Sequence, residues 1–209
     1  MGMVRALLLF LLLAALGIGS RVALPIEEVE VVGLRHLSAE AVQQITGLRP
    51  GQPWLWAWPY RLEPLRQNPW VKSAVLERPA PGRLRIVLEE RSPVAHLVQK
   101  QRRYGLSPEG VLLPDAPAKG PFLEGRGEVP IADLLALVAI FPQAERIRYD
   151  VGGYQVLGPS LNVWGRNVSE LQDWVQTRKM GRSDAKTLQP DVLSGSRIYV
   201  YSWGVSARR

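Results

Sequence analysis

The sequence predicts an α+β protein: an N-terminal transmembrane helix, then a domain with the order β-α-α-β-β, then a second mixed, β-rich α/β domain. Three features predict this order. An uncharged apolar run covers residues 6–20, a strand–turn–strand pattern covers residues 68–95, and short alternating segments dominate the rest of the chain. The predicted domains are residues 1–24 (a short cytoplasmic tail and the anchor), 25–95 and 96–209.

The N-terminal run Ala6–Ser20 carries no charge and is flanked by Arg5 and Arg21. As a helix, these fifteen residues rise about 22 Å, which is less than the roughly 30 Å of a bilayer's hydrocarbon core. The flanking residues would lengthen the span if the Arg5 side chain reached the headgroups, and this predicts a signal anchor with a cytoplasmic N-terminus. A cleaved signal peptide ending near Gly17–Gly19 is the alternative.

The predicted first domain begins with a strand at Ile26–Val32, whose glutamates suit the edge of a sheet. Ser38 predicts the N-cap of a short helix that ends at Gly47. A second short helix is predicted over Tyr60–Gln67, with Pro64 acceptable only in its first turn. Two amphipathic helices need a sheet to cover, and the strands of this domain supply it.

A β-hairpin completes this domain. Two runs with a period of two, Val71–Arg78 and Leu84–Glu89, are joined by a short segment rich in Pro and Gly. In the first run, one face is expected to be mostly apolar, because two sets of residues alternate: Val71, Ser73, Val75 and Glu77 with Lys72, Ala74, Leu76 and Arg78.

The second domain is predicted to contain short strands and two helices. A helix over Ile131–Phe141 is bounded by prolines on both sides, and a helix over Ser169–Met180 stops at Gly181. The predicted strands lie at Leu97–Val98, on either side of an acidic-Gly turn in Tyr104–Leu113, and at Arg146–Tyr149, Gly153–Leu157, Leu161–Trp164 and Arg197–Trp203.

Composition excludes several kinds of site. The chain has no cysteine and only two histidines, His36 and His96, which lack ligand-like spacing to acidic residues and are expected in loops or at the surface. The net charge of +7 is spread along the chain, whereas nucleic-acid-binding surfaces concentrate basic residues. Glu89, Glu90 and Arg91 close the first domain. The two glutamates are adjacent on a strand and point to opposite faces, which predicts an ion pair at the domain junction and no acid/base pair.

The motif V-x-G-L after a strand, then P-W-V-x-x-A-x-V-x-R-x-P, then I-V-L-E-E-R-S-P-V-A resembles a POTRA domain of the FtsQ/DivIB family of bacterial cell-division proteins. Segment Pro121–Gly125 and the elements around it resemble the second domain of that family, so the resemblance covers nearly all of the chain. The residues that carry it in the first domain are Val31, Gly33, Leu34, Pro69, Trp70, Val71, Ala74, Val75, Arg78, Pro79, Leu84, Ile86, Glu90, Arg91, Pro93, Val94 and Ala95.

The resemblance implies a non-enzymatic, single-pass scaffold of the cell inner membrane, with most of the chain in the periplasm at the division septum. It implies partners similar to the single-pass division proteins FtsB and FtsL and other membrane components of the divisome. No cofactor, metal, nucleic acid or small-molecule substrate is expected. The alternative is an accessory protein of polypeptide transport or outer-membrane export, because POTRA domains occur there as well.

The resemblance also implies that the segment Asp191–Trp203 docks an FtsB-like partner by edge-strand addition. The alternative is that its aromatic residues only cover a helix. The predicted partner-binding residues are Arg197, Ile198, Tyr199, Val200, Tyr201, Ser202 and Trp203.

Three tryptophans form a second candidate surface. Trp54, Trp56 and Trp58 would project from one side of an extended segment, and as an exposed patch they would contact a partner or the membrane. The alternative is that they fill the core of the first domain beside its two short helices.

Overall fold

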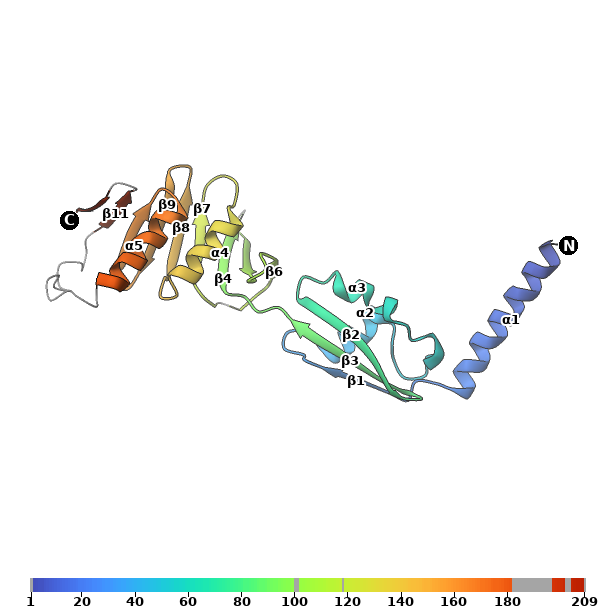
Figure 1. Ribbon diagram of the computed structural model, residues 1–209. Helices are drawn as coiled ribbons and strands as arrows, with labels where there is room; N and C mark the ends of the chain where they lie inside the picture. Colours follow the sequence, from blue (N-terminus) through green and yellow to red (C-terminus); the bar gives the residue numbers. More distant parts are fainter. Residues whose placement is uncertain (1, 100–101, 118, 182–196, 202–203, 209) are drawn as a thin grey trace. The chain divides into compact units, whose positions relative to one another are not determined.

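The computed structural model describes residues 2–99, 102–117, 119–181, 197–201 and 204–208. The chain divides into two compact units, Met1–Arg91 and Ser92–Arg209. Each unit is built around its own sheet (Figure 1). The limits at residues 24 and 95 stay predictions.

Helix α1 covers Gly2–Ala23. No helix in the described part of the chain is both long and apolar enough to cross a membrane, so the predicted transmembrane helix is wrong. The reason lies in the sequence: the uncharged run is only fifteen residues long, and Arg5 and Arg21 lie inside the same helix. The prediction depended on these arginines reaching the headgroups to lengthen a span that is too short by itself.

The first unit places two helices on a three-stranded sheet (Figure 1). The strand order is β1-β3-β2, with β1 parallel to β3 and β3 antiparallel to β2. The POTRA-like order β-α-α-β-β is present, with two 3₁₀ turns before the second helix. The elements are β1 (Glu28–Val32), α2 (Ala39–Thr46), η1 (Trp54–Trp56), η2 (Pro59–Leu62), α3 (Glu63–Arg66), β2 (Val71–Ala80) and β3 (Arg83–Glu90).

Local chemistry sets the helix limits as predicted. The Ser38 hydroxyl accepts a hydrogen bond from the Ala41 N–H at 3.2 Å, which caps α2. Gly47 ends the helix in the left-handed conformation, at φ 66°. The predicted second helix is shorter than expected: its first half is the 3₁₀ turn η2, and Pro64 falls in the first turn of α3.

A register shift in β2 changes which residues face the core. The pairing with β3 slips between Val71 and Ser73, so that Val71 and Ala74 are both buried while Val75 is exposed. Strict alternation across this strand is therefore wrong. The buried residues of the first unit lie between the helices and one face of the sheet: Ile26, Val42, Leu48, Ala57, Leu62, Leu65, Val71, Ala74, Leu84, Ile86 and Leu88.

The second unit contains one mixed sheet and two helices. Its strand order is β12-β11-β10-β9-β8-β7-β4-β5-β6, so the predicted β-rich domain is present. The elements are β4 (Ala95–Gln99), β5 (Arg102–Leu106), β6 (Leu112–Pro114), β7 (Phe122–Gly125), α4 (Ile131–Ile140), β8 (Arg146–Asp150), β9 (Gly153–Gly158), β10 (Leu161–Gly165), α5 (Val168–Gly181), β11 (Arg197–Tyr201) and β12 (Gly204–Arg208).

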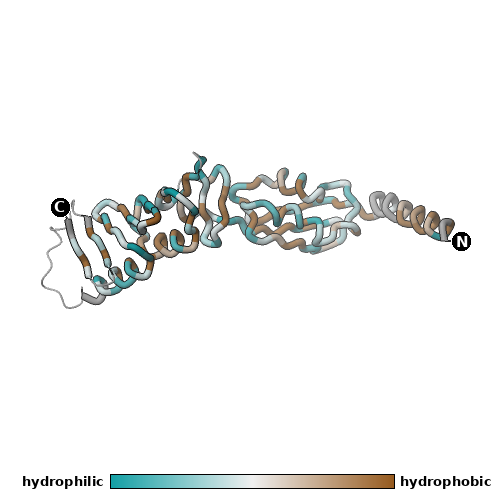
Figure 2. Tube along the Cα trace, turned by 90° about the horizontal axis from the view of Figure 1, so that it is seen from above, coloured by the Kyte–Doolittle hydropathy of each residue, from teal (hydrophilic) through white to brown (hydrophobic). Residues whose placement is uncertain are grey.

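Helices α4 and α5 lie on the same face of this sheet (Figure 1). Residues that share a register position share a face, so the buried Ile147, Val156, Val163 and Ile198 line the face under the helices. Hydrophobic and hydrophilic residues accordingly alternate along these strands (Figure 2). The opposite face carries polar and aromatic side chains at matching positions of β8, β9, β10 and β11: Arg148, Gln155, Trp164 and Tyr199.

Candidate partner-binding surfaces

The predicted docking strand lies inside the sheet and not at its edge. Strand β11 pairs in parallel with β10 and antiparallel with β12. The edge strands of the described sheet are β12 and β6, so the expected open edge at Arg197–Trp203 is not found at β11. Residues 191–196, Ser202 and Trp203 lie outside the described residues, so the structure shows only Arg197–Tyr201 of the predicted docking strand.

Side chains of β11 alternate as the sequence predicts. Ile198 and Val200 are buried under the helices, whereas Tyr199 and Tyr201 are half-buried on the opposite face. The alternative, in which the tyrosines cover a helix, therefore does not hold. Tyr199 and Trp164 occupy matching positions on β11 and β10, so they share this face.

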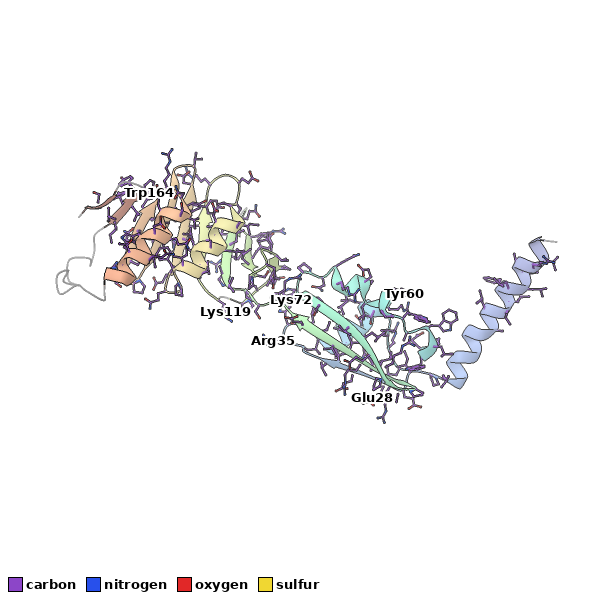
Figure 3. The ribbon with its side chains drawn as sticks, in the orientation of Figure 1. Glu28, Arg35, Tyr60, Lys72, Lys119 and Trp164 are labelled. Atoms are coloured by element: carbon purple, nitrogen blue, oxygen red, sulfur yellow. The ribbon has the colours of Figure 1, made fainter. Side chains whose placement is uncertain are left out.

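Three aromatic rings form a cluster on the face without helices. The ring of Trp164, labelled in Figure 3, lies 6.0 Å from that of Tyr199 and 5.9 Å from that of Tyr201, both in tilted geometry. Beside it, Gln155 donates a hydrogen bond to Asn162 at 2.8 Å. We call Trp164, Tyr199 and Tyr201 the aromatic cluster; it adjoins the edge strand β12.

Charged side chains continue this face over β7 and β8. Arg146 and Arg148 both contact the Glu124 carboxylate, at 3.0 and 2.7 Å. Their hydrogen bonds lower the pKa of Glu124, chiefly through Arg148. Two arginines thus share one carboxylate on the face of the sheet that also carries the aromatic cluster.

The three tryptophans of the first unit divide between core and surface. They do not form an extended segment: Trp54–Trp56 is a 3₁₀ turn. Trp54 packs against the buried core, and its indole N–H donates to the Arg83 carbonyl at 3.2 Å. Trp56 and Trp58 are 41% and 50% exposed, so the core alternative holds for Trp54 alone. Contact of the exposed rings with a partner or the membrane stays a prediction.

Glu89 and Glu90 lie in different environments, because adjacent strand residues point to opposite faces of the sheet. Glu89 is exposed and contacts Lys72 at 2.7 Å, and this contact lowers the pKa of Glu89. Glu90 is buried and accepts backbone N–H groups from Arg35, His36 and Leu37 at 3.2, 2.7 and 3.1 Å. Its role is to bind the loop between β1 and α2, and sequence reasoning missed it.

The predicted surface position of His96 is wrong, since its side chain is only 3% exposed. Its Nε2 accepts a hydrogen bond from the Lys119 N–H, which requires a neutral imidazole. Burial, and to a lesser degree the charge of Arg103, lowers the pKa of His96. His36 lies in the loop bound by Glu90, and its ring stacks on Trp70 at 3.7 Å. Among the described residues no group of His, Asp or Glu side chains could hold a metal ion.

Comparison with known proteins adds to this geometry. Residues 24–91 match the POTRA domain of FtsQ type. The chain is also similar to Cell division protein FtsQ of Chloroflexus aggregans, with 38% identity over 71 residues. This alignment covers 34% of the chain and 26% of that relative, so the chain matches about a quarter of the relative's length.

The first unit has the element order β-α-α-β-β that the sequence predicts, and the match to the FtsQ-type POTRA domain falls within this unit. The first unit therefore carries a POTRA domain similar to that of the FtsQ/DivIB family.

Proposed function

We propose that this protein is a non-enzymatic scaffold of the bacterial division machinery, which binds FtsB- and FtsL-like proteins through the terminal strands of its second unit. The family match supports the cell-division part of this proposal. The observation that supports the binding mode is the edge strand β12, which pairs on one side only within the described sheet.

Edge strands bind peptides through main-chain hydrogen bonds. In an antiparallel pair, alternate residues direct both their N–H and C=O groups away from the neighbouring strand. Gly204–Arg208 therefore offers such groups on its outer side. An added partner strand would continue the sheet, and side chains that flank it would reach the aromatic cluster on the helix-free face.

The aromatic cluster supplies specificity in this proposal. Tyr and Trp are enriched among residues that dominate binding energy, because they bury large areas at low entropic cost. The half-buried rings of Trp164, Tyr199 and Tyr201 hold each other in place before a partner arrives. A helical segment that follows the added strand would pack on these rings.

Two proline variants test the binding mode. Val205 and Ser206 are adjacent on β12, so one directs its N–H toward β11 and the other outward. Proline at the residue whose N–H points outward should abolish binding of purified FtsB–FtsL-like partners to the full chain, while the sheet stays folded. Proline at the residue whose N–H points toward β11 should disturb the sheet itself. Titration calorimetry and circular dichroism measure the two effects. If Val205→Pro and Ser206→Pro are both folded and bind like the unchanged protein, edge addition at β12 is excluded.

A second test addresses the alternative function. Crosslinking in the source cells, followed by purification of this chain, identifies the proteins that accompany it. FtsB- and FtsL-like proteins would support the scaffold, and a fluorescent fusion should then concentrate at the septum. Barrel or export components would instead support a role in polypeptide transport.

A further inference from the structure

The first unit carries an exposed apolar surface that the proposed partner binding does not use. It lies on the segment Trp54–Tyr60, which we call the tryptophan loop. Its exposed members are Leu55 at 43%, Trp56 at 41%, Trp58 at 50% and Tyr60 at 64%. Tyr60 projects away from the sheet (Figure 3). Large aromatic side chains gathered at this exposure mark an interaction surface more often than a single exposed leucine does.

The tryptophan loop is held rigidly. The Trp54 N–H donates to the Leu24 carbonyl at 3.0 Å, and the Ala57 N–H donates to the Trp54 carbonyl at 3.1 Å. Ala57 is fully buried beneath the loop. The exposed rings are therefore displayed by a fixed backbone, so little conformational entropy is lost when they bind.

Arg78 fixes the two flanking tryptophans. Its guanidinium lies 5.1 Å from the Trp54 ring and 5.2 Å from the Trp58 ring, and it donates a hydrogen bond to the Ala57 carbonyl. One arginine from β2 thus orders the loop from beneath. These contacts involve Trp54 and Trp58, whereas Trp56 and Tyr60 are 41% and 64% exposed.

The charge of the surrounding segment is of one sign. Residues 41–62 contain two arginines, Arg49 and Arg61, and no acidic residue. The next carboxylate along the chain, Glu63, forms an ion pair with Arg66 at 3.5 Å. The exposed aromatic surface therefore lies in a basic segment.

We propose that the tryptophan loop contacts the surface of an anionic lipid bilayer. Trp and Tyr are the residues enriched at the membrane–water interface, because their rings are apolar while the indole N–H and phenol O–H remain hydrated. Nearby arginines add attraction to anionic headgroups. A contact of this kind needs no helix to cross the bilayer, and it is independent of the partner binding proposed for β12.

Because the chain has no cysteine, one introduced cysteine can be labelled selectively. The full chain carrying Leu55→Cys is labelled with a fluorophore that shifts to shorter wavelength in lipid, and is mixed with phosphatidylcholine vesicles that contain or lack phosphatidylglycerol. The matched control is Val75→Cys, which is 53% exposed on the helix-free face of the same unit. We expect a lipid-like shift at position 55 with anionic vesicles, a smaller shift with neutral ones, and none at position 75.

Removal of the exposed rings should reduce the lipid contact of the probe at position 55. The double variant Trp56→Ser/Tyr60→Ser in the Leu55→Cys background is expected to lower the ratio of lipid-contacting to water-exposed probe about tenfold, with an unchanged circular dichroism spectrum. A probe that stays water-exposed at position 55 with both kinds of vesicle overturns the proposal, as does an equal shift at positions 55 and 75. A probe that becomes buried only when a purified division protein is added assigns the loop to a protein partner and also overturns it.

Discussion

In each unit a buried titratable side chain accepts a backbone N–H from a loop, but the two units use different chemistry. Glu90 in the first unit is a carboxylate that binds three successive N–H groups of residues 35–37. His96 in the second unit is an imidazole that binds one, from Lys119. The carboxylate has several acceptor sites, whereas the imidazole accepts only while it is neutral. The loop contact in the first unit therefore depends on a buried carboxylate, and the loop contact in the second unit depends on an imidazole that stays neutral.

The largest effect is expected when the hydrogen bonds of Glu90 are removed. Glu90→Ala should lower the free energy of unfolding of the first unit by about 3–5 kcal/mol, because three N–H groups lose a charged acceptor. Urea unfolding, with hydrogen exchange at residues 35–37, measures the loss. Glu90→Gln keeps one acceptor oxygen and should cost less, so it remains informative if the alanine variant does not fold.

The neighbouring carboxylate is the matched control. Glu89→Gln removes an exposed ion pair with Lys72 and should leave the unfolding midpoint almost unchanged. Equal losses for Glu89→Gln and Glu90→Ala would contradict the assignment of Glu90 as the group that binds the loop.

The next effect concerns the residue at which this loop begins. Gly33 has φ 87°, and a Cβ there would lie 1.9 Å from the Leu88 carbonyl oxygen. Gly33→Ala should therefore cost more than about 2 kcal/mol, since it adds a backbone clash to an unfavourable conformation. Gly51 has nearly the same φ, 84°, but nothing within 4 Å, so that Gly51→Ala should cost only about 1 kcal/mol. Thermal unfolding of both variants compares the two, and similar losses would argue against the clash.

The third prediction concerns how the stability of the second unit depends on pH. Burial lowers the pKa of His96, so the unfolded chain binds a proton more readily than the folded one. The stability of the second unit should be fully present above the ordinary histidine pKa of about 6.5, and should fall as the pH drops below it toward the lowered value. Thermal unfolding between about pH 7.5 and 5.5 measures this. In His96→Gln the slope over this range should be smaller; an unchanged slope would assign it to other groups.

The smallest effect is expected on the helix-free face of the first unit. Arg85 contacts Glu30 at 2.6 Å and Glu77 at 3.8 Å, and these carboxylates raise its pKa. All three side chains are solvent-exposed, so Arg85→Gln should change the unfolding midpoint only slightly, and less in high salt. A large, salt-independent loss would show that this row of ion pairs is a structural element comparable to Glu90.

Local signals predicted the helices and most strands. Ser38 and Gly47 delimit α2 because caps are encoded within a few residues, and Pro64 falls where a proline is tolerated. Prediction of the hairpin faces failed at the register shift after Val71, because a bulge depends on pairing with β3 and leaves no mark in the alternation of β2 itself.

The candidate sites were less predictable because they depend on contacts between distant residues. The aromatic alternation of β11 is visible in the sequence, but its interior position depends on β12, whose residues Gly204–Arg208 lack a clear apolar alternation. Burial of His96 depends on Lys119, and the loop role of Glu90 on residues 35–37. The transmembrane prediction failed because it gave more weight to the apolar residues of 6–20 than to the arginines beside them.

The parallel pairing of β10 with β11 has a consequence for the order of folding during synthesis. These strands meet only after α5 and all the residues between them have been made, so this contact closes late. Until then, Val163 and Leu171 lack the cover that Ile198 and Val200 provide, and β10 is an unpaired edge. A nascent chain arrested before residue 197 should therefore be more prone to proteolysis and aggregation than the finished one, and the surface proposed to recruit the division partners exists only once translation has passed it.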